Sequence, residues 1–483
     1  MTTLIQGGWV IGSNGRNHRL VENGVVVFDE EQILHVGRSY SGQVDETIDA
    51  TGKIVAPGFI NTHCHVETPV NSEAINIDGD CRLTFGNPNI PFLPTKDNWD
   101  KKRLSDAQFR AIATFSLCAL LKSGCTTIVE MGAGRTSLVE LVGQLGLKAY
   151  LGPGFRSAET YTGDDGTYYH KDWNEERGFK GLEKAKAFVE KYDGAYDGRV
   201  KGLLIPLQVD TCTPNLLQEV RKIANEMKTV RIGIHAGQRV FEFHEILRKY
   251  KNTPIGFLND IGFLGPDVLI GHALLVSGHS WTAYSGGNDV ETLASTRTSV
   301  AHCPLVAART SCALQSFSRY LRAGVNMTIG TDTWPLDIIS EMRWASIIGK
   351  LMEGSRAAAS ALKVFNAATL SAARALGRND IGRLAKGAKA DIVILNVANF
   401  RYAPIADPIK SLVNAGTCDD VETVIINGQK LIEAKTMLGV VEREVMKAAD
   451  KVAQDTWAKI PEWDWAQRSL YDIGPMSLQS FEK

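Results

Sequence analysis

The sequence predicts an α/β protein in which a (β/α)8 barrel of the TIM type carries a small β-sandwich built from both chain ends. Through the middle of the chain, short β-branched runs alternate with longer amphipathic stretches, a pattern typical of βα units around a parallel sheet. The two ends instead hold short alternating strands separated by tight turns. The 483 residues exceed the roughly 250 that such a barrel needs, which leaves room for a second unit and for insertions.

The charge balance and the cysteine content limit which partners, metal motifs and cellular location we expect for this protein. Lys and Arg total 53 against 54 for Asp and Glu, and this net charge of −1 gives no reason to expect a nucleic acid or an anionic membrane as partner. The 8 cysteines form no CxxC pair, so a zinc ribbon has no support. The N-terminus lacks the features of a signal peptide, and no apolar run is long enough to span a bilayer. We therefore expect a cytoplasmic protein with mostly buried thiols.

The predicted sandwich combines residues 1–57 with residues 386–440. Both ranges contain short runs in which apolar and polar residues alternate, as they do in half-buried strands. The runs cover residues 3–7, 24–29 and 32–36 near the N-terminus and residues 390–395 and 421–428 near the C-terminus. The two ends of the chain are therefore expected to meet outside the barrel.

Residues 58–385 are predicted to form the barrel from eight strands, each followed by a helix. The clearest helix covers residues 106–122, with Ala111, Phe115, Cys118 and Leu121 on one face. Eight such units predict closure into a barrel instead of an open sheet. The expected strands are 55–65, 126–131, 149–152, 202–209, 231–235, 268–273, 300–303 and 327–332.

Two insertions and a tail fall outside this pattern. Residues 68–103 follow the first strand and are rich in Asn, Asp and Pro, while residues 156–180 follow the third strand and are rich in aromatic residues. Loops of this length are usually functional or disordered, and here they would lie over the barrel face where active sites occur. Residues 441–483 begin as a helix and become rich in Trp, and we interpret them as an extension that packs against the body or a sister subunit.

Five metal-compatible side chains stand at the C-terminal ends of the predicted barrel strands. His63 and His65 are two residues apart on the first strand, so both side chains point to the same face. His235 ends the fifth strand, His272 the sixth and Asp332 the eighth. An isolated HxH pair is common by chance, but this ordered set of imidazoles and a carboxylate at strand ends is not. It predicts a metal centre.

Six segments carry a resemblance to a known family. They are APGFINTHCH (56–65), IH (234–235), GH (271–272), AHCP (301–304), GTD (330–332) and GRLAKGAKAD (382–391). In this combination the chain resembles the amidohydrolase superfamily, and within it the branch of cytosine-deaminase-like and chloro-triazine hydrolases. The resemblance runs over most of residues 1–435 and leaves out the two insertions and the tail.

The resemblance implies that His63, His65 and His235 are neutral imidazole ligands and that Asp332 is the fourth ligand. Asp332 would also take a proton from water on the metal, whose pKa a divalent ion lowers to roughly 7. His272 would orient that water or polarise the substrate. Members with two metals carry a lysine on the fourth strand, and residues 202–210 hold none. One divalent ion is therefore expected, zinc first, with iron, cobalt and manganese as alternatives.

Gln238 departs from the deaminase pattern of this branch. Those deaminases place a glutamate three residues after the fifth-strand histidine, where it shuttles a proton, and this chain has glutamine there. A carboxamide donates and accepts hydrogen bonds but does not exchange a proton at useful pKa. Gln238 is thus expected at the catalytic centre and in contact with substrate. Glu67, Glu242 and Glu245 either replace the missing acid or are ordinary surface charges.

Further residues are candidates for substrate binding. Tyr161, Tyr168 and Trp173 in the second insertion either form a wall for an apolar or aromatic substrate or anchor the insertion itself. Trp334 follows Asp332 closely and is expected near the metal. His302 ends the seventh strand, where it faces the pocket or packs inside the barrel.

These features predict a metal-dependent hydrolase that cleaves a C–N bond of a small molecule. The bond would belong to an amide, urea, carbamate-like group or amino-heterocycle, and metal-activated hydroxide would attack it. The missing glutamate leaves two alternatives, hydrolytic dechlorination of a halo-heterocycle and deamination of a nucleobase-type ring by a non-standard acid. A non-enzymatic assembly protein of the same fold is a third alternative, which the retained ligand set disfavours. The family and the Trp-rich tail favour a homodimer or a higher homo-oligomer.

Overall fold

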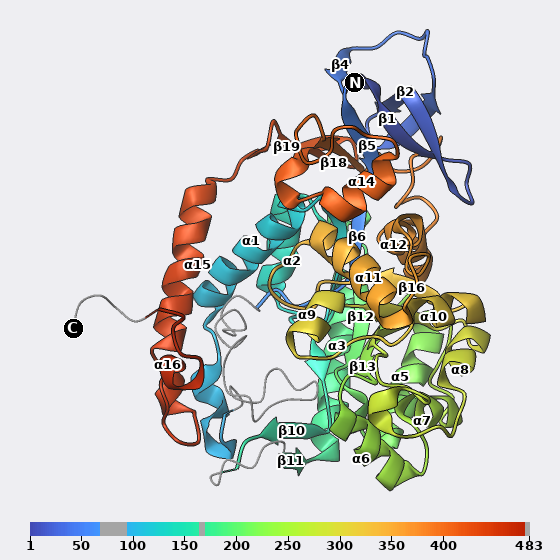
Figure 1. Ribbon diagram of the computed structural model, residues 1–483. Coiled ribbons are helices and arrows are strands. Elements are labelled where there is room, and N and C mark those ends of the chain that lie inside the picture. Colours follow the sequence, from blue (N-terminus) through green and yellow to red (C-terminus); the bar gives the residue numbers. More distant parts are fainter. Residues whose placement is uncertain (68–93, 164–169, 479–483) are drawn as a thin grey trace.

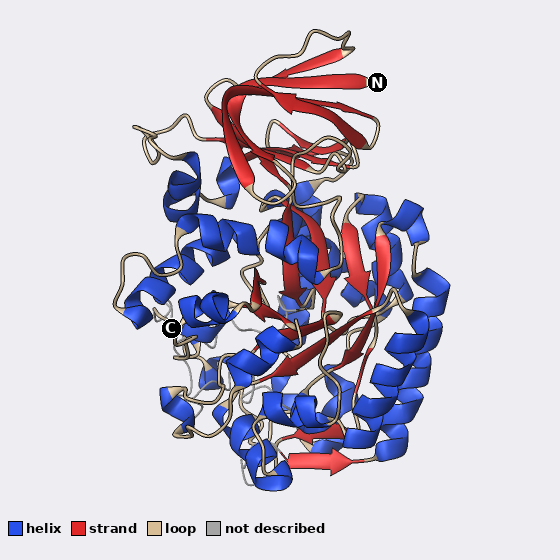
Figure 2. Cartoon of the chain, turned by 90° about the vertical axis from the view of Figure 1, so that its right-hand side faces the viewer, coloured by secondary structure: helices blue, strands red, loops and turns tan. Residues whose placement is uncertain are grey.

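The structure is a computed structural model that describes residues 1–67, 94–163 and 170–478. Two large sheets organise these residues: a parallel barrel surrounded by helices, and a separate sheet at one end of it (Figures 1 and 2). This arrangement confirms the predicted α/β fold. The barrel strands, in sheet order, are β6 (Phe59–Cys64), β7 (Cys125–Glu130), β8 (Lys148–Leu151), β12 (Val200–Pro206), β13 (Arg231–Ala236), β14 (Val268–His272), β15 (Ser299–His302) and β16 (Asn326–Ile329).

The first and last barrel strands meet at the C-terminal edge of the barrel. Asp332, just beyond β16, donates its backbone N–H to the carbonyl of His63 at 2.8 Å and accepts the N–H of His65 at 2.8 Å. These two bonds close the ring of strands. They also fix three of the predicted metal-centre residues side by side.

Apolar side chains fill the barrel and cover its outside. Ile60, Val129, Leu203, Leu269 and Ala301 belong to one buried cluster inside the ring of strands. A second, larger cluster lies between the strands and the surrounding helices. Because both faces are covered, the strands are buried along nearly their whole length, as expected for a parallel sheet.

Helix α1 (Asp106–Lys122) has the bounds that the sequence predicted. It begins at Ser105, whose side chain forms a capping box with Gln108. One face packs on the barrel, while Ala111 and Phe115 pack against α15 (Glu442–Trp457) of the C-terminal extension. The extension therefore covers a helix face that would otherwise meet solvent.

The other helices of the barrel region surround the strands (Figure 2). They are α2 (Thr136–Leu145), α3 (Glu175–Tyr192), α4 (Ala195–Gly198), α5 (Pro214–Met227), α6 (Val240–Tyr250), α7 (Pro254–Asp260), α8 (Asp289–Ser295), α9 (Pro304–Arg309), α10 (Phe317–Ala323), α11 (Ile338–Glu353), α12 (Ala361–Ala367) and α13 (Leu370–Ala375). Short 3-10 helices are η5 (Val209–Thr211) and η6 (Ser280–Thr282).

The separate sheet draws its strands from both ends of the chain and encloses its own apolar core. The two ends join where β5 pairs antiparallel with β17. The strands are β1 (Thr2–Ser13), β2 (His18–Asp29), β3 (Gln32–Gly37), β4 (Glu46–Asp49), β5 (Lys53–Pro57), β17 (Ile392–Asn396), β18 (Val421–Ile426), β19 (Gln429–Glu433) and β20 (Thr436–Met437). Helix α14 (Pro408–Ala415) and η7 (Cys418–Asp420) lie between β17 and β18.

The described parts of the insertions contact each other and the C-terminal extension. β10 (Ala158–Tyr161) and β11 (His170–Trp173) form an antiparallel hairpin, and the N–H of Thr162 donates to the carbonyl of Pro94 at 3.0 Å. The N–H of Thr95, just before η4 (Lys96–Lys102), donates to the carbonyl of Trp463 at 3.2 Å. The extension also contains η8 (Ile460–Glu462) and α16 (Leu470–Ile473). Most of the first insertion lies outside the described residues.

Two further observations bear on the sequence expectations. None of the described helices combines the length and the apolar character that crossing a lipid bilayer requires. Seven cysteines lie in the described ranges as unpaired thiols, and six of these are buried.

A buried ion pair joins the barrel to the separate sheet. Lys148, at the start of β8, bonds Asp391, just before β17, and both side chains are at most 4% exposed. Asp391 also accepts the backbone N–H of Asn427 at 3.0 Å. Burial lowers the pKa of Lys148, while Asp391 opposes that shift.

Replacing Lys148 by methionine is expected to reduce the free energy of unfolding by about 3–5 kcal/mol, because the charge of Asp391 stays buried without its partner. Urea unfolding measures the loss. Lys451→Met is the control, since its pair with Asp455 is exposed and such pairs contribute about 0–1 kcal/mol. Equal losses in the two variants would contradict the prediction.

Candidate metal centre

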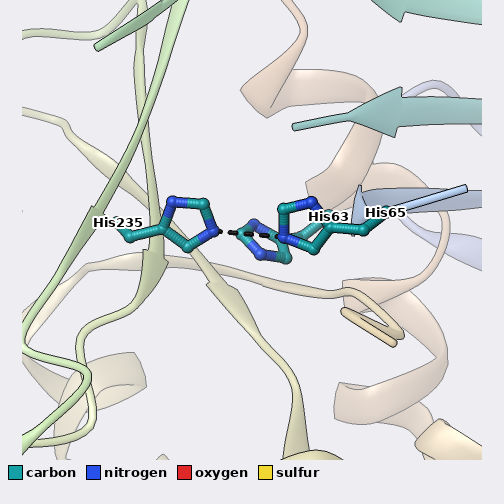
Figure 3. Close-up of side chains that lie close together, drawn as sticks. All are labelled: His63, His65 and His235. Carbon is teal, nitrogen blue, oxygen red and sulfur yellow. Dashed lines mark hydrogen bonds between the residues drawn. The ribbon is translucent and has the colours of Figure 1, made fainter. Parts of the chain in front are cut away.

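The five predicted metal-centre residues meet at the C-terminal edge of the barrel. His63 lies in β6 and His65 just beyond it, so strand alternation turns both imidazoles to one side. His235 belongs to β13 and His272 ends β14, while Asp332 follows β16. In Figure 3, the rings of His63, His65 and His235 converge on one another.

The spacing of the donor atoms fits a bound divalent ion. Nε2 of His65 lies 3.3 Å from Nε2 of His235 and 3.3 Å from Oδ1 of Asp332, and Nε2 of His63 lies 3.5 Å from the same oxygen. Ligands at about 2.0–2.1 Å from a tetrahedral zinc ion are themselves about 3.3 Å apart. Both ring nitrogens of His63 are buried and make no hydrogen bond within the described chain. The residues therefore fit a metal ion well.

The charge states also suit metal binding. Burial lowers the pKa of His63, His235 and His272, that of His272 to about 3, so these imidazoles stay neutral with a lone pair to offer. Burial alone would raise the pKa of Asp332, but the surrounding histidines, His272 foremost, hold it well below its ordinary value. Neutral imidazole and ionised carboxylate are the forms that ligate metals.

Neighbouring groups orient these side chains. The carbonyl of Leu207 lies 2.5 Å from Nδ1 of His235 and accepts its proton, which leaves Nε2 free to face the other ligands. Asn61 and Thr331 bond each other across the first and last strands, with Nδ2 of Asn61 donating to Oγ1 of Thr331 at 2.8 Å. Asp332 itself has a φ of +58°, a conformation that the strand pairing on both sides holds in place.

Gly271 leaves the space that the imidazole of His63 occupies. A Cβ at this position would lie 2.4 Å from Cε1 of His63. Gly271→Ala is therefore expected to displace the ring and to weaken metal binding by about 10–100-fold, the range seen when ligand orientation is disturbed. Competition with a chelator measures the affinity. Unchanged affinity in a variant of normal thermal stability would contradict this prediction.

A cavity of about 550 Å³ opens over the cluster. His65, His235 and Asp332 form part of its wall, and Gln238 lines it as well. Its volume is in the range of small-molecule sites, roughly 300–1,000 Å³. The wall is strongly polar, so the cavity suits a small ligand with several hydrogen-bonding groups.

The three glutamates considered as replacement acids occupy different places. Glu67 lines the cavity and pairs with Arg135 at 3.3 Å. Glu242 is fully buried behind the loop after β13, where it accepts backbone N–H groups. Glu245 pairs with Lys171 of the β11 strand. Among the three, only Glu67 lines the cavity.

Sequence reasoning missed Glu130. This residue ends β7, is buried and lines the cavity. One of its oxygens accepts the N–H of Gly132 at 3.1 Å and that of Ala133 at 2.6 Å. Burial raises the pKa of its carboxyl to about 7. The available signal was a single charged residue at the C-terminal end of an otherwise uncharged barrel strand, a position typical of active-site residues.

The aromatic candidates do not line the cavity in the described part of the chain. Tyr161 stacks on His170 with ring centroids 5.3 Å apart, and Trp173 is 41% exposed beneath the ammonium of Lys249. Tyr168 lies outside the described residues. The substrate-binding roles of these residues stay predictions.

Trp334 and His302 lie near the centre but outside the cavity wall. Trp334 is 37% exposed, with the guanidinium of Arg309 over its ring. His302 is buried at the end of β15 against Phe317, and burial lowers its pKa to about 3. Their roles also remain to be tested.

Comparison of the sequence with known proteins finds relatives that are named as deaminases. The chain is 28% identical to a 5'-deoxyadenosine deaminase of Methanosarcina barkeri over 451 residues, which cover 91% of this chain and 95% of that protein. It is 31% identical to a 5-methylthioadenosine/S-adenosylhomocysteine deaminase of Thermococcus kodakarensis over 439 residues, 89% of this chain and 94% of that protein.

Comparison of the fold with solved structures finds two zinc-bound hydrolases of the same architecture. An adenosine deaminase from Xanthomonas campestris with bound zinc superposes with a TM-score of 0.77 at 19% identity, over 94% of this chain and 98% of that one. The zinc complex of an atrazine chlorohydrolase from Arthrobacter aurescens gives 0.75 at 20% identity, over 93% of this chain and all of that one. At these identities the likeness establishes the fold.

The model of the amidohydrolase family matches residues 54–431, most of the chain. With the His/Asp cluster, this match supports a bound divalent metal. It also confirms the expectation of a metal-dependent hydrolase that acts on carbon–nitrogen bonds of small molecules. The chain belongs to the amidohydrolase family.

Proposed function

We propose that this protein hydrolyses the bond between a ring carbon and an amino group of a small aminated heterocycle, using one zinc ion. His63, His65, His235 and Asp332 hold the ion. The observation that carries the proposal is the donor spacing of 3.3–3.5 Å among these side chains beneath a polar cavity. The deaminase names of relatives that match about nine-tenths of the chain favour amine release, with aminopurine nucleosides as the first substrates to try.

The two oxygens of Asp332 face different partners, which suits two tasks. Oδ1 lies toward His63 and His65, at 3.5 and 3.3 Å, and is the ligand atom. Oδ2 lies 3.7 Å from Nε2 of His272 and is placed to carry a proton. A divalent ion held by these residues would lower the pKa of water to about 7 and so supply hydroxide near neutral pH. Oδ2 of Asp332 would accept the proton released from that water and return it to the leaving amine.

His272 and Gln238 are assigned to the substrate. His272 is neutral and buried, so its ring can donate a hydrogen bond to, or accept one from, a nitrogen or oxygen bonded to the carbon under attack. Gln238 lines the cavity and binds the heterocycle through its carboxamide without transferring a proton. Proton transfer therefore rests on Asp332.

An ammonia-release screen tests the proposal. The panel contains adenosine, 5'-deoxyadenosine, 5-methylthioadenosine, guanine and cytosine, with simple amides and ureas as the second arm. We expect ammonia from at least one aminated ring, loss of the activity with a chelator and recovery with zinc. Hydrolysis confined to amides or ureas would contradict the proposed substrate class.

Gln238 favours one second candidate, the hydrolytic dechlorination of a halo-heterocycle. Chloride leaves without taking up a proton, so this reaction does not need the acid that glutamine cannot supply. A chlorohydrolase is among the matching folds. Chloride release from chlorinated triazines, without ammonia release in the first screen, would favour it.

Two further expectations about the protein belong to the proposal. A homo-oligomer is expected from the family and the tail, and light scattering coupled to gel filtration measures its mass. The expected cytoplasmic location is tested by fractionating cells that express the protein.

A further inference from the structure

Glu242 forms a buried hydrogen-bond hub behind the cavity wall. Its Oε1 accepts the N–H of Gly237 at 2.6 Å, and its Oε2 accepts the N–H of Gln238 at 3.2 Å. The side-chain amide of Gln208 donates to the same Oε2 at 3.4 Å. Gln208 and Gln238 both line the cavity, whereas Glu242 is fully buried. One carboxylate therefore joins the segments after β12 and β13.

The bond pattern restricts how the two glutamines are presented. The two oxygens of Glu242 accept all three of these N–H groups, so the amide nitrogen of Gln208 faces the carboxyl group and the carbonyl oxygen of that side chain is left for other partners. At Gly237 the chain turns with a φ of +65°, which a glycine adopts without strain. Fixing the N–H groups on both sides of that turn fixes the start of the Gln238 side chain.

Charged neighbours surround this hub. Asp210 is fully buried and pairs with Lys171 at 2.8 Å. Burial, and after it the charge of Asp210, raise the pKa of Glu242 to about 8, while the N–H groups of Gly237 and Gln238 and the charge of Arg239 oppose that shift. The hub thus belongs to a compact network of charged side chains, in which Lys171 also pairs with Glu245, and not to a solvated helix surface.

We propose that Glu242 is a positioning residue that holds Gln208 and Gln238 as a neutral recognition pair, and that this pair selects substrates whose edge carries both a hydrogen-bond donor and an acceptor. An aminated ring with an adjacent ring nitrogen has such an edge, as has an amide or a lactam. A halogenated ring without N–H groups does not. This inference rests on the proposed function and adds the residues that choose among its substrates.

Hydrogen–deuterium exchange tests the positioning role without any substrate. We compare wild type with Glu242→Gln and Glu242→Ala, and with Glu245→Gln as the control on the same helix, whose carboxylate pairs with Lys171 instead. The amides of Gly237 and Gln238 are expected to exchange at least about 10-fold faster in both Glu242 variants, because each loses an acceptor. They should be unchanged in the control. Equal exchange in all four proteins would overturn the proposal.

Kinetics and metal content test the recognition role. Zinc content should stay at the wild-type level, since the hydrogen bonds of Glu242 go to Gln208, Gly237 and Gln238 and not to the four ligand side chains. For an aminated substrate, KM should rise about 3–10-fold with kcat nearly unchanged, the effect of losing a hydrogen bond in binding. Gln208→Leu, which leaves Glu242 in place, should give the same pattern. A fall in kcat at constant KM, or loss of zinc, would overturn the assignment. If no substrate is found, the exchange result alone decides the positioning role.

Discussion

Replacing His63 by alanine is expected to leave the purified protein without its metal and without hydrolytic activity. His63 is fully buried, and its ring centroid lies 4.8 Å from that of His235 and 4.9 Å from that of His272. Disturbing an outer partner of a ligand lowers metal affinity about 10–100-fold, so loss of the ligand itself should exceed that range. Elemental analysis and the ammonia assay on the same preparation measure both losses.

A histidine outside the site provides the control for this variant. His279 is buried, its Nε2 lies 3.1 Å from the carbonyl of Ala313, and it is not among the clustered donors. His279→Gln should keep close to one equivalent of metal and full activity. Retention of metal by His63→Ala would refute the assigned ligand set, and two equivalents in wild type would mean that a bridging ligand had been missed.

The barrel was predictable because its signals are local and repeated. Buried parallel strands are short apolar runs, and all eight expected runs overlap the strands observed. The metal-centre residues were predictable for a related reason. A barrel places the C-terminal ends of its strands at one rim, so His63, His235 and Asp332 had to approach each other once the barrel was inferred.

The carboxylates around the centre were not predictable, because their roles depend on burial. In the sequence, Glu242 is one of several charges on a helix, yet it is fully buried and accepts two backbone N–H groups. Glu130 carries no motif, and its one sequence signal is that it is a charged residue at the end of a predicted strand; its burial and its place in the cavity wall become visible only in the fold. Neither pattern can be read without knowing which elements pack together.

Side chains on the insertions and the tail were equally hard to place. The sequence predicted one apolar face on α1, and Ala111 and Phe115 of that face pack against α15 of the tail. A second side of the helix, with Phe109, Ala113 and Leu117, is buried in the barrel core. Trp173 was grouped with possible substrate contacts by its composition alone, and it contacts Lys249 on the protein surface. Whether such a side chain is buried or exposed depends on contacts with segments that are distant in the sequence.

Replacing Asp332 by asparagine is expected to separate metal binding from proton transfer. Asparagine keeps an oxygen that can ligate, and it tolerates the left-handed backbone of this position, where φ is +58°. It cannot accept the proton that Oδ2 of Asp332 is placed to carry. We therefore expect zinc to remain bound at close to one equivalent, with kcat about 10²–10⁴-fold lower, the usual contribution of a general base.

The pair of variants distinguishes two reasons for inactivity. His63→Ala should lack both metal and activity, and excess zinc should not restore turnover. Asp332→Asn should hold zinc and bind substrate with a KM near the wild-type value, because its defect concerns a proton and not the cavity.

Should Asp332→Asn retain most of its kcat with zinc bound, proton transfer would have to pass to another group in the cavity. Among the described residues, Glu67 and Glu130 are the further carboxyl groups that line it. Glu67→Gln and Glu130→Gln in the Asp332→Asn background would then identify the acceptor.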